Sequence, residues 1–189
     1  MAIRHGILAL LQDKSRYGYE LRAEFESRTG TVWPLNIGQV YSTLDRLERD
    51  GLVNRDGSDG EGHVIYSLSE AGREELELWF GAAVGRDTPP RNELAIKLAL
   101  AATLPGTDLP AIIQDQRAAS FRKLQELHQL RKEPSPGPRS TDTARLLVLD
   151  SLVFQLEAEL RWLELCEARL VHTGQIPAVV PGNGNGTGG

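Results

Sequence analysis

The stretch WPLNIGQVYSTLDRLERDGLV, residues 33–53, predicts a capped helix with two chemically different sides. Asn36 is a residue type that caps helix N-termini, and Gly51 is the type that ends helices. Between them, apolar side chains recur with the 3.6-residue period of a helix, which marks the side that faces a hydrophobic core. The apolar residues at this period are Ile37, Val40, Tyr41, Leu44 and Leu47.

The opposite side of this helix carries short or hydrogen-bonding side chains. A DNA major groove admits a helix whose leading residues are slim, and amides, hydroxyls and guanidinium groups read base edges there. The N–H groups at the start of the helix can also face a phosphate. A solvated surface helix carries the same residue types, so this helix alone supports both interpretations equally. A rotation of about 100° per residue places on this side Gly38, Gln39, Ser42, Arg46 and Arg49.

The segments around this helix predict further helices and a hairpin. Residues 2–12 and 15–30 each place apolar side chains at successive helical turns, so we expect two helices there. The runs at 52–57 and 63–69 are rich in strand-forming residues, and the segment SDGEG at 58–62 separates them. This pattern is typical of a β-hairpin with a mobile tip.

A fourth helix is expected after the hairpin. Ser69 is a suitable cap, and Leu76, Trp79 and Phe80 share the apolar side of the helix that follows. The order helix, helix, helix, hairpin, helix is that of a winged helix-turn-helix. The predicted fold is therefore mainly α with a small β-hairpin, an N-terminal winged helix-turn-helix followed by a helical domain.

Glycine and proline clusters set the expected domain boundaries. A linker at 83–92 separates a winged helix-turn-helix domain at 1–82 from a helical domain at 93–173. Three prolines within 132–143 must separate two helices of the second domain. The glycine-rich segment 174–189 buries too little apolar surface to offset the entropy of ordering it, so we expect a disordered tail.

Composition argues against an enzyme and against a membrane protein. The 189 residues are 40% hydrophobic and 25% charged, with no signal peptide and no apolar run that spans a membrane, so we expect a cytoplasmic protein. Cys166 is the single cysteine, lies in an apolar helical run and is expected to be a buried small hydrophobe. The four histidines are scattered, and we find no phosphate-binding glycine loop, nucleophile elbow or carboxylate pair. No cofactor or metal is expected.

Three segments resemble the PadR family of bacterial transcriptional regulators. They are YGYELRAEF at 17–25, PLNIGQVYSTLDRLERDGLV at 34–53 and YSLSEAG at 66–72, in the order and spacing of the family. The second half is similar to the helical C-terminal part of many members, through LAIKLAL at 94–100 and ELRWLELCEARL at 159–170. The resemblance implies a DNA-binding repressor that is usually dimeric.

The resemblance also implies which residues face DNA. Tyr41 is either a core aromatic whose hydroxyl reaches the surface or a phosphate contact. Tyr17 is expected mainly in the core and Tyr19 toward phosphate, while Arg22 is equally a phosphate contact or a solvated arginine. The residues expected to face the groove or the phosphates are Asn36, Gly38, Gln39, Ser42 and Arg46.

The wing departs from the family pattern. Many relatives have a basic approach to the second wing strand, but here the stretch is GEGHVIYSL, in which only His63 remains as a potential cation. The wing tip holds three carboxylates, and residues 1–85 carry 9 Lys and Arg against 14 Asp and Glu. This charge predicts weak non-specific affinity for DNA. The carboxylates of the tip are those of Asp56, Asp59 and Glu61.

The last helix predicts an assembly surface. Leucines recur every seven residues, which is the pattern of a helix that packs against a partner. Part of that partner can be intramolecular, because residues 111–130 are also apolar on one side. Trp162 beside this stripe could line a cleft for a small apolar or aromatic effector, although core or interface tryptophans are commoner. The predicted dimerisation residues are Leu149, Leu152, Leu156, Leu160, Leu163 and Leu170.

The function predicted from these features is that of a PadR-like repressor. A homodimer would occupy a palindromic operator in double-stranded DNA, with relief by an effector. The acidic wing motivates an alternative, a winged-helix module for protein interaction or ligand sensing whose DNA binding is weak or lost.

Overall fold

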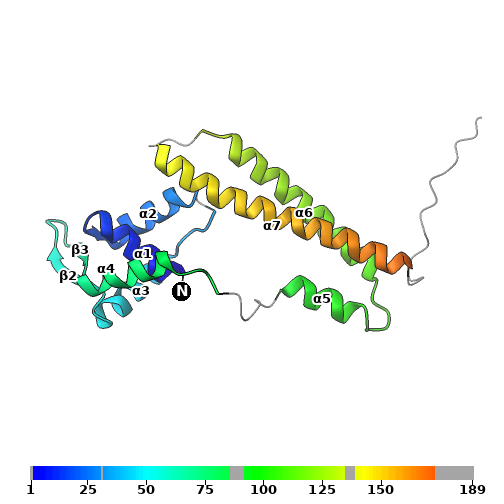
Figure 1. The fold of residues 1–189 in the computed structure, drawn as a ribbon, viewed down its shortest axis with the longest axis horizontal. Helices are drawn as coiled ribbons and strands as arrows, with labels where there is room; N and C mark the ends of the chain where they lie inside the picture. Colours follow the sequence, from blue (N-terminus) through cyan, green and yellow to red (C-terminus); the bar gives the residue numbers. More distant parts are fainter. Residues whose placement is uncertain (1, 31, 86–91, 135–138, 173–189) are drawn as a thin grey trace, which may run out of the picture. The chain divides into compact units, whose positions relative to one another are not determined.

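The computed structural model describes residues 2–30, 32–85, 92–134 and 139–172. The predicted linker at 83–92 lies mostly outside these residues, and the predicted tail at 174–189 lies entirely outside them. Figure 1 shows the elements in chain order: α1 (Ala2–Asp13), β1 (Arg16–Tyr17), α2 (Gly18–Arg28), α3 (Ile37–Arg49), β2 (Val53–Ser58), β3 (Val64–Leu68), α4 (Glu70–Gly81), α5 (Glu93–Ala101), α6 (Leu109–Lys132) and α7 (Arg139–His172).

The described chain divides into two compact units. The first contains the described residues before position 90 together with those of 133–150, and the second contains those of 90–132 together with those from 151 onward. The predicted division placed all of 93–173 in one domain, whereas the contacts assign the first turns of α7 to the N-terminal unit. Arg145 illustrates these contacts, because its side chain packs against Gly30 after α2.

The predicted hairpin is present and forms part of a three-stranded antiparallel sheet with the order β1-β3-β2. In β2 and β3, Val53 lies opposite Leu68 and Arg55 lies opposite Tyr66. The two-residue strand β1 was not predicted, because it is too short to show a period-two pattern and forms only through its pairing with β3. Tyr17 therefore ends a strand and caps α2, where the sequence had suggested a helical position.

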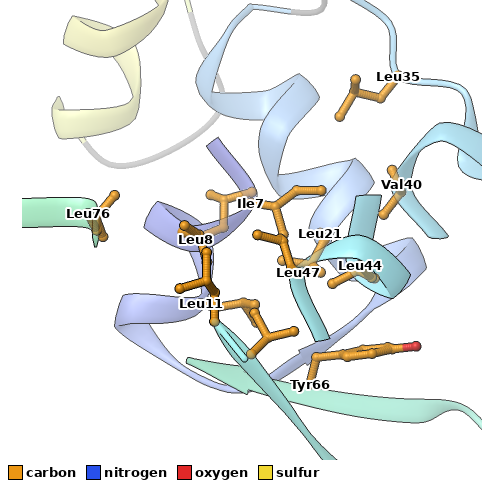
Figure 2. Packing of buried hydrophobic residues seen from close by; sticks show 13 residues of the cluster. Ile7, Leu8, Leu11, Leu21, Leu35, Val40, Leu44, Leu47, Tyr66 and Leu76 are labelled. Carbon is orange, nitrogen blue, oxygen red and sulfur yellow. The ribbon is translucent and has the colours of Figure 1, made fainter. Parts of the chain in front are cut away.

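The N-terminal unit is built around one hydrophobic cluster that every helix from α1 to α4 enters (Figure 2). The predicted apolar side of α3 is confirmed, because Val40, Leu44 and Leu47 are fully buried and Ile37 and Tyr41 pack against the cluster in part. The other labelled members come from the neighbouring elements: Ile7, Leu8, Leu11, Leu21, Leu35, Tyr66 and Leu76.

The predicted apolar side of α4 is correct only for Leu76. Trp79 is 38% exposed and Phe80 is 65% exposed, although the sequence placed both beside Leu76. Trp79 lies at the margin of the cluster, where its ring stacks on that of His5 with the centroids 5.1 Å apart. Phe80 lies one residue further around the helix and contacts Trp79 rather than the core.

In the second unit, α6 and the later part of α7 form an antiparallel pair (Figure 1). Ile113 and Leu163 are fully buried between α5, α6 and α7. Polar contacts continue the pair, since buried Ser120 donates to Glu159 at 2.5 Å and Arg117 pairs with Glu167 at 2.7 Å. Among the helices that the structure describes, none is both long and apolar enough to span a membrane.

Candidate nucleic-acid interface

The start of α3 is fixed by its cap. The Asn36 side-chain oxygen accepts a hydrogen bond from the Gly38 N–H at 2.8 Å, as the sequence predicted for a cap residue. Gly38 is exposed, and a Cβ at this position would lie 3.2 Å from the same Asn36 oxygen. The leading end of α3 is therefore slim for two linked reasons, a short cap and a glycine beside it.

The polar side of α3 is exposed, as the pattern predicted. Gln39, Ser42 and Arg46 all project from the side opposite the buried leucines. The Ser42 hydroxyl donates to the Gln39 carbonyl at 3.1 Å, so its remaining capacity is that of an acceptor. Within the described residues, the Arg46 side chain has no ion-pair or hydrogen-bond partner, and the residue is exposed. The neighbouring Arg49 differs, because its Nε lies 3.6 Å from Asp50.

The exposed side of α3 also contains Asp45, which the sequence reasoning did not single out. Asp45 is separated from Gly38, Ser42 and Arg49 by seven, three and four residues, so all four lie on one side of the helix. Its carboxylate lies 3.9 Å from Nη2 of Arg55 in β2. Helical spacing alone would have found Asp45, because it occupies the centre of the same row.

Tyr19 and Tyr41 form an aromatic pair beside this row. Tyr41 is partly buried against the core and Tyr19 is 54% exposed, with ring centroids 6.4 Å apart in an edge-on arrangement. A Cβ on Gly18 would lie 2.7 Å from the Tyr41 ring, so a glycine is needed there for the ring to pack. Burial raises the pKa of Tyr41, and the nearby Tyr19 adds to this, so the hydroxyl remains a neutral donor at neutral pH.

Arg22 is held by an ion pair. Its Nε lies 3.1 Å from the Glu26 carboxylate, and the same carboxylate accepts the Leu35 N–H at 3.1 Å. The pair thus ties α2 to the segment that leads into α3. Between the two interpretations left open by the sequence, a solvated arginine or a phosphate contact, the structure adds a third role in positioning this segment.

Polar side chains of the wing tip pair with one another. His63 Nδ1 lies 2.9 Å from Asp59 and 3.8 Å from Glu61, and the imidazole ring stacks on Tyr17 with centroids 4.7 Å apart. Hydrogen bonding to His63 holds the pKa of Asp59 below its ordinary value. Any positive charge on His63 is therefore faced by two carboxylates of the same tip. Asp56, also at the tip, is exposed.

The first wing strand supplies an arginine, Arg55, which lies outside the stretch GEGHVIYSL in which His63 is the candidate cation. Arg55 lies opposite Tyr66 of the second wing strand. Its Nη2 lies 3.0 Å from Glu48 of α3 and 3.4 Å from the Tyr66 hydroxyl, and its guanidinium lies 5.7 Å from the centre of the Tyr66 ring. The sequence reasoning compared only the second strand with the family and therefore missed an arginine on the first.

The predicted dimerisation leucines lie largely inside the chain. Leu149, Leu163 and Leu170 are buried within the single chain, and Leu152, Leu156 and Leu160 are partly buried. Part of the partner of the heptad side is therefore intramolecular, one of the possibilities that the sequence left open, and its role in a dimer stays a prediction. The apolar side chains that α7 does expose form another row: Leu147 and Phe154, each 68% exposed, and Leu165, 49% exposed.

Trp162 packs, partly buried, against the cluster of α5, α6 and α7 together with Leu94 and Cys166. Burial raises the pKa of the Cys166 thiol, which keeps it protonated.

A depression of about 670 Å³ lies elsewhere, on α4, and Trp162 is not among the residues that line it. Within the described residues no three His, Cys, Asp or Glu side chains come together to hold a metal.

Comparison with known proteins identifies two segments. Residues 7–78 match the model of the transcriptional regulator PadR-like family, and residues 90–171 match that of the virulence activator alpha C-terminal region. A probable transcriptional regulator of Mycobacterium tuberculosis is 28% identical over 184 residues, which covers 89% of this chain and 97% of that protein.

Solved structures with a similar fold include two regulators. Bacillus subtilis PadR in complex with operator DNA is 22% identical with a TM-score of 0.68, over 89% of this chain and 97% of that one. Its complex with p-coumaric acid is also similar, with 21% identity and a TM-score of 0.68 over 90% and 99% of the two chains. The Vibrio cholerae virulence activator AphA is 23% identical with a TM-score of 0.66, over 90% and 98%. At these identities the likeness concerns the winged-helix fold.

Proposed function

We propose that this chain, which matches the PadR-like family model over residues 7–78 and is similar to a probable transcriptional regulator, is a repressor that binds an operator as a homodimer. Its site of action would be the cytoplasm, where the DNA is. The observation that carries the proposal is the exposed polar row of α3, in which a slim N-terminus precedes Gln39, Ser42 and the unpaired Arg46 within the described residues. These groups have the chemistry that reads base edges and binds phosphates.

The remaining interface residues follow from their places around this row. Asn36 and Gly38 let the helix approach the groove closely, and Tyr19 and Tyr41 present hydroxyls beside it. Arg22 would contribute less, because it must share its charge with Glu26. His63 would contribute least, because two carboxylates of the wing tip compete with phosphate for it.

The dimer would form through the exposed row of α7. Leu147, Phe154 and Leu165 are seven and eleven residues apart, which is about two and three helical turns. Helical period places all three on one side of α7, and an exposed apolar stripe of this kind is stabilised by contact with a second helix. A second copy of the chain supplies an identical stripe, so a symmetric pair would cover both.

Two linked subunits explain how a domain with little positive charge binds an operator. Once one recognition helix occupies its half-site, the second binds at the effective concentration set by the tether. A palindromic operator with half-sites about one helical turn apart matches the symmetry of the pair. An effector that favours another separation of the two helices would lower affinity. The complex of Bacillus subtilis PadR with p-coumaric acid supports a small aromatic effector, and Trp162 is the residue we propose beside it.

The acidic wing favours a second candidate function. Asp56, Asp59 and Glu61 lie at the tip, and the only histidine there is already paired with two of them. A wing with this charge repels phosphates at long range. A winged-helix module for protein interaction or ligand sensing, with weak or lost DNA binding, would retain the fold and tolerate this charge.

A mobility-shift experiment separates the two functions. The parent should shift DNA from upstream of its own gene at low salt, and Gln39→Ala and Arg46→Ala should each weaken binding by about 1–3 kcal/mol. Thermal stability should barely change, because both side chains lie off the buried side of α3. Arg73→Ala on α4 is the matched control, since it removes an exposed arginine away from this row. If the parent shifts no DNA, the second function is supported; equal binding by all variants would refute the assignment of this side of α3.

A further inference from the structure

Four side chains join the end of α3 to the wing. Nη2 of Arg55 lies 3.0 Å from Glu48, 3.9 Å from Asp45 and 3.4 Å from the hydroxyl of Tyr66. Tyr66 is 2% exposed and belongs to the core, so it gives the arginine a fixed surface to pack on. A flexible side chain on a hairpin is thereby held at the margin of the exposed row of α3.

The positive charge of Arg55 offsets negative charge at the exposed row of α3. Asp45 lies within the row, and Glu48 lies at its margin one turn away. Two carboxylates at this position would repel the phosphates on either side of a groove. Among the described residues, Arg55 is the cation that pairs with both carboxylates, and it reaches them from the wing.

Arg55 also retains donors for a ligand. A guanidinium has five N–H donors, and the side-chain hydrogen bonds and ion pairs of Arg55 with the described residues use only Nη2. The side chain is 46% exposed, and neither Nε nor Nη1 forms a hydrogen bond or ion pair with a described residue. A planar fork with donors on two edges can bind a carboxylate on one edge and a phosphate on the other.

We propose that Arg55 is a phosphate-contacting residue of the wing, positioned by Glu48, Asp45 and Tyr66, and that it shields the two carboxylates of α3 from the DNA. This inference rests on the proposed function and assigns it a residue that neither the family resemblance nor the sequence pattern indicated. The rival interpretation is that Arg55 only holds the wing to α3. A surface ion pair contributes little to stability, so under that interpretation the loss of the Arg55 charge should change DNA binding little.

The test compares variants on two duplexes, the fragment from upstream of the protein's own gene and a mixed-sequence duplex. Arg55→Gln removes the charge at similar length and should weaken binding to both by a similar factor of about five or more, because phosphate contacts do not read sequence. The slope of log affinity against log salt should become shallower by about one. Gln39→Ala should instead weaken binding mainly to the upstream fragment.

The carboxylates are tested in the Arg55→Gln background. Adding Glu48→Gln and Asp45→Asn should recover part of the lost affinity, because unshielded carboxylates no longer face the phosphates, but should leave the salt slope shallow. Full recovery of both affinity and slope would mean that Arg55 only neutralises the carboxylates, and the phosphate contact would be refuted. Arg55→Lys should retain more affinity than Arg55→Gln, since it keeps the charge without the fork.

Controls separate this inference from the proposed function. Arg73→Gln removes an arginine of similar exposure, 45% against 46%, and should change neither affinity nor slope. The thermal midpoints of Arg55→Gln and Arg73→Gln should agree, which excludes unfolding as the cause. If Arg55→Gln binds like the parent while Arg46→Ala is weakened, the inference fails and the proposed function stands. If the parent binds neither duplex, both fail together.

Discussion

Helices α3 and α7 each bury one apolar side within the chain, yet they expose different chemistry on the other. In α3 the exposed side carries an amide, a hydroxyl, a guanidinium and the Asp45 carboxylate around Ser42. In α7 the exposed side carries Leu147, Phe154 and Leu165. The exposed side of α3 is readily hydrated and suited to polar ligands, whereas the exposed side of α7 presents apolar area whose burial is favourable.

This difference teaches how far an apolar pattern can be taken. In α3 there is one apolar stripe, and it is the buried one. In α7 there are two, and the more regular of them, with leucines every seven residues, packs against the chain's own helices around Leu163. The stripe available to a partner is the less regular one, which breaks the heptad spacing at Leu165.

The prediction with the largest expected effect tests whether the buried sides of α3 and α7 contribute equally to the free energy of unfolding. Leu44→Ala in α3 and Leu163→Ala in α7 should each lower the free energy of unfolding by about 2–5 kcal/mol, because both leucines are fully buried and leave cavities. Urea denaturation followed by circular dichroism measures the loss. Ser42→Ala is the control and should change the free energy by less than about 0.5 kcal/mol. A small cost at Leu163 alone would show that α7 is not packed there.

The next effect tests the exposed sides. Phe154→Asp combined with Leu165→Asp places two carboxylates on the exposed stripe of α7, where they are costly to bury against a partner. The variant should sediment as a smaller species, keep its helical circular dichroism and bind operator DNA at least about tenfold more weakly. Gln155→Asp, on another exposed side of the same helix, should do none of this. A variant that remains dimeric would place the interface elsewhere.

The smallest effect concerns how α3 is anchored. Asp50 at its C-terminus pairs with Arg4 of α1 at 2.6 Å, and this hydrogen bond lowers the pKa of the Asp50 carboxyl. A carboxyl whose pKa is lower in the folded state adds stability above its unfolded pKa of about 3.9, and this stability is lost as pH falls through the folded pKa.

The parent should therefore lose more stability than Asp50→Asn between about pH 5 and pH 3. Urea midpoints at the two pH values measure this, with Asp115→Asn on α6 as the control. Because Asp50 and Arg4 are both partly exposed, the difference should be small. Parallel pH profiles for the parent and Asp50→Asn would show that the pair does not anchor α3.

Much of the candidate site was predictable because it depends on local pattern. The Asn36 cap, the buried side of α3 and the polar row opposite it follow from residue type and helical period within about fifteen residues. Ser69 as the cap of α4 follows in the same way, and its hydroxyl accepts the Gly72 N–H at 3.0 Å. Asp45 follows the same helical period, so its place in the polar row is also set by local sequence.

The sequence by itself determined the helix caps, the apolar periods of the helices and the order of the elements. Each of these depends on residues that are close together along the chain. Only the tertiary structure decided which surfaces meet. It pairs the two-residue strand β1 with β3, brings Arg55 of the wing to Glu48 of α3, and covers Leu163 with the chain's own helices. Contacts of this kind join residues that are distant in sequence. Because the hydrophobic effect is non-directional, an apolar stripe predicts that one side of a helix is buried but does not identify the element that buries it.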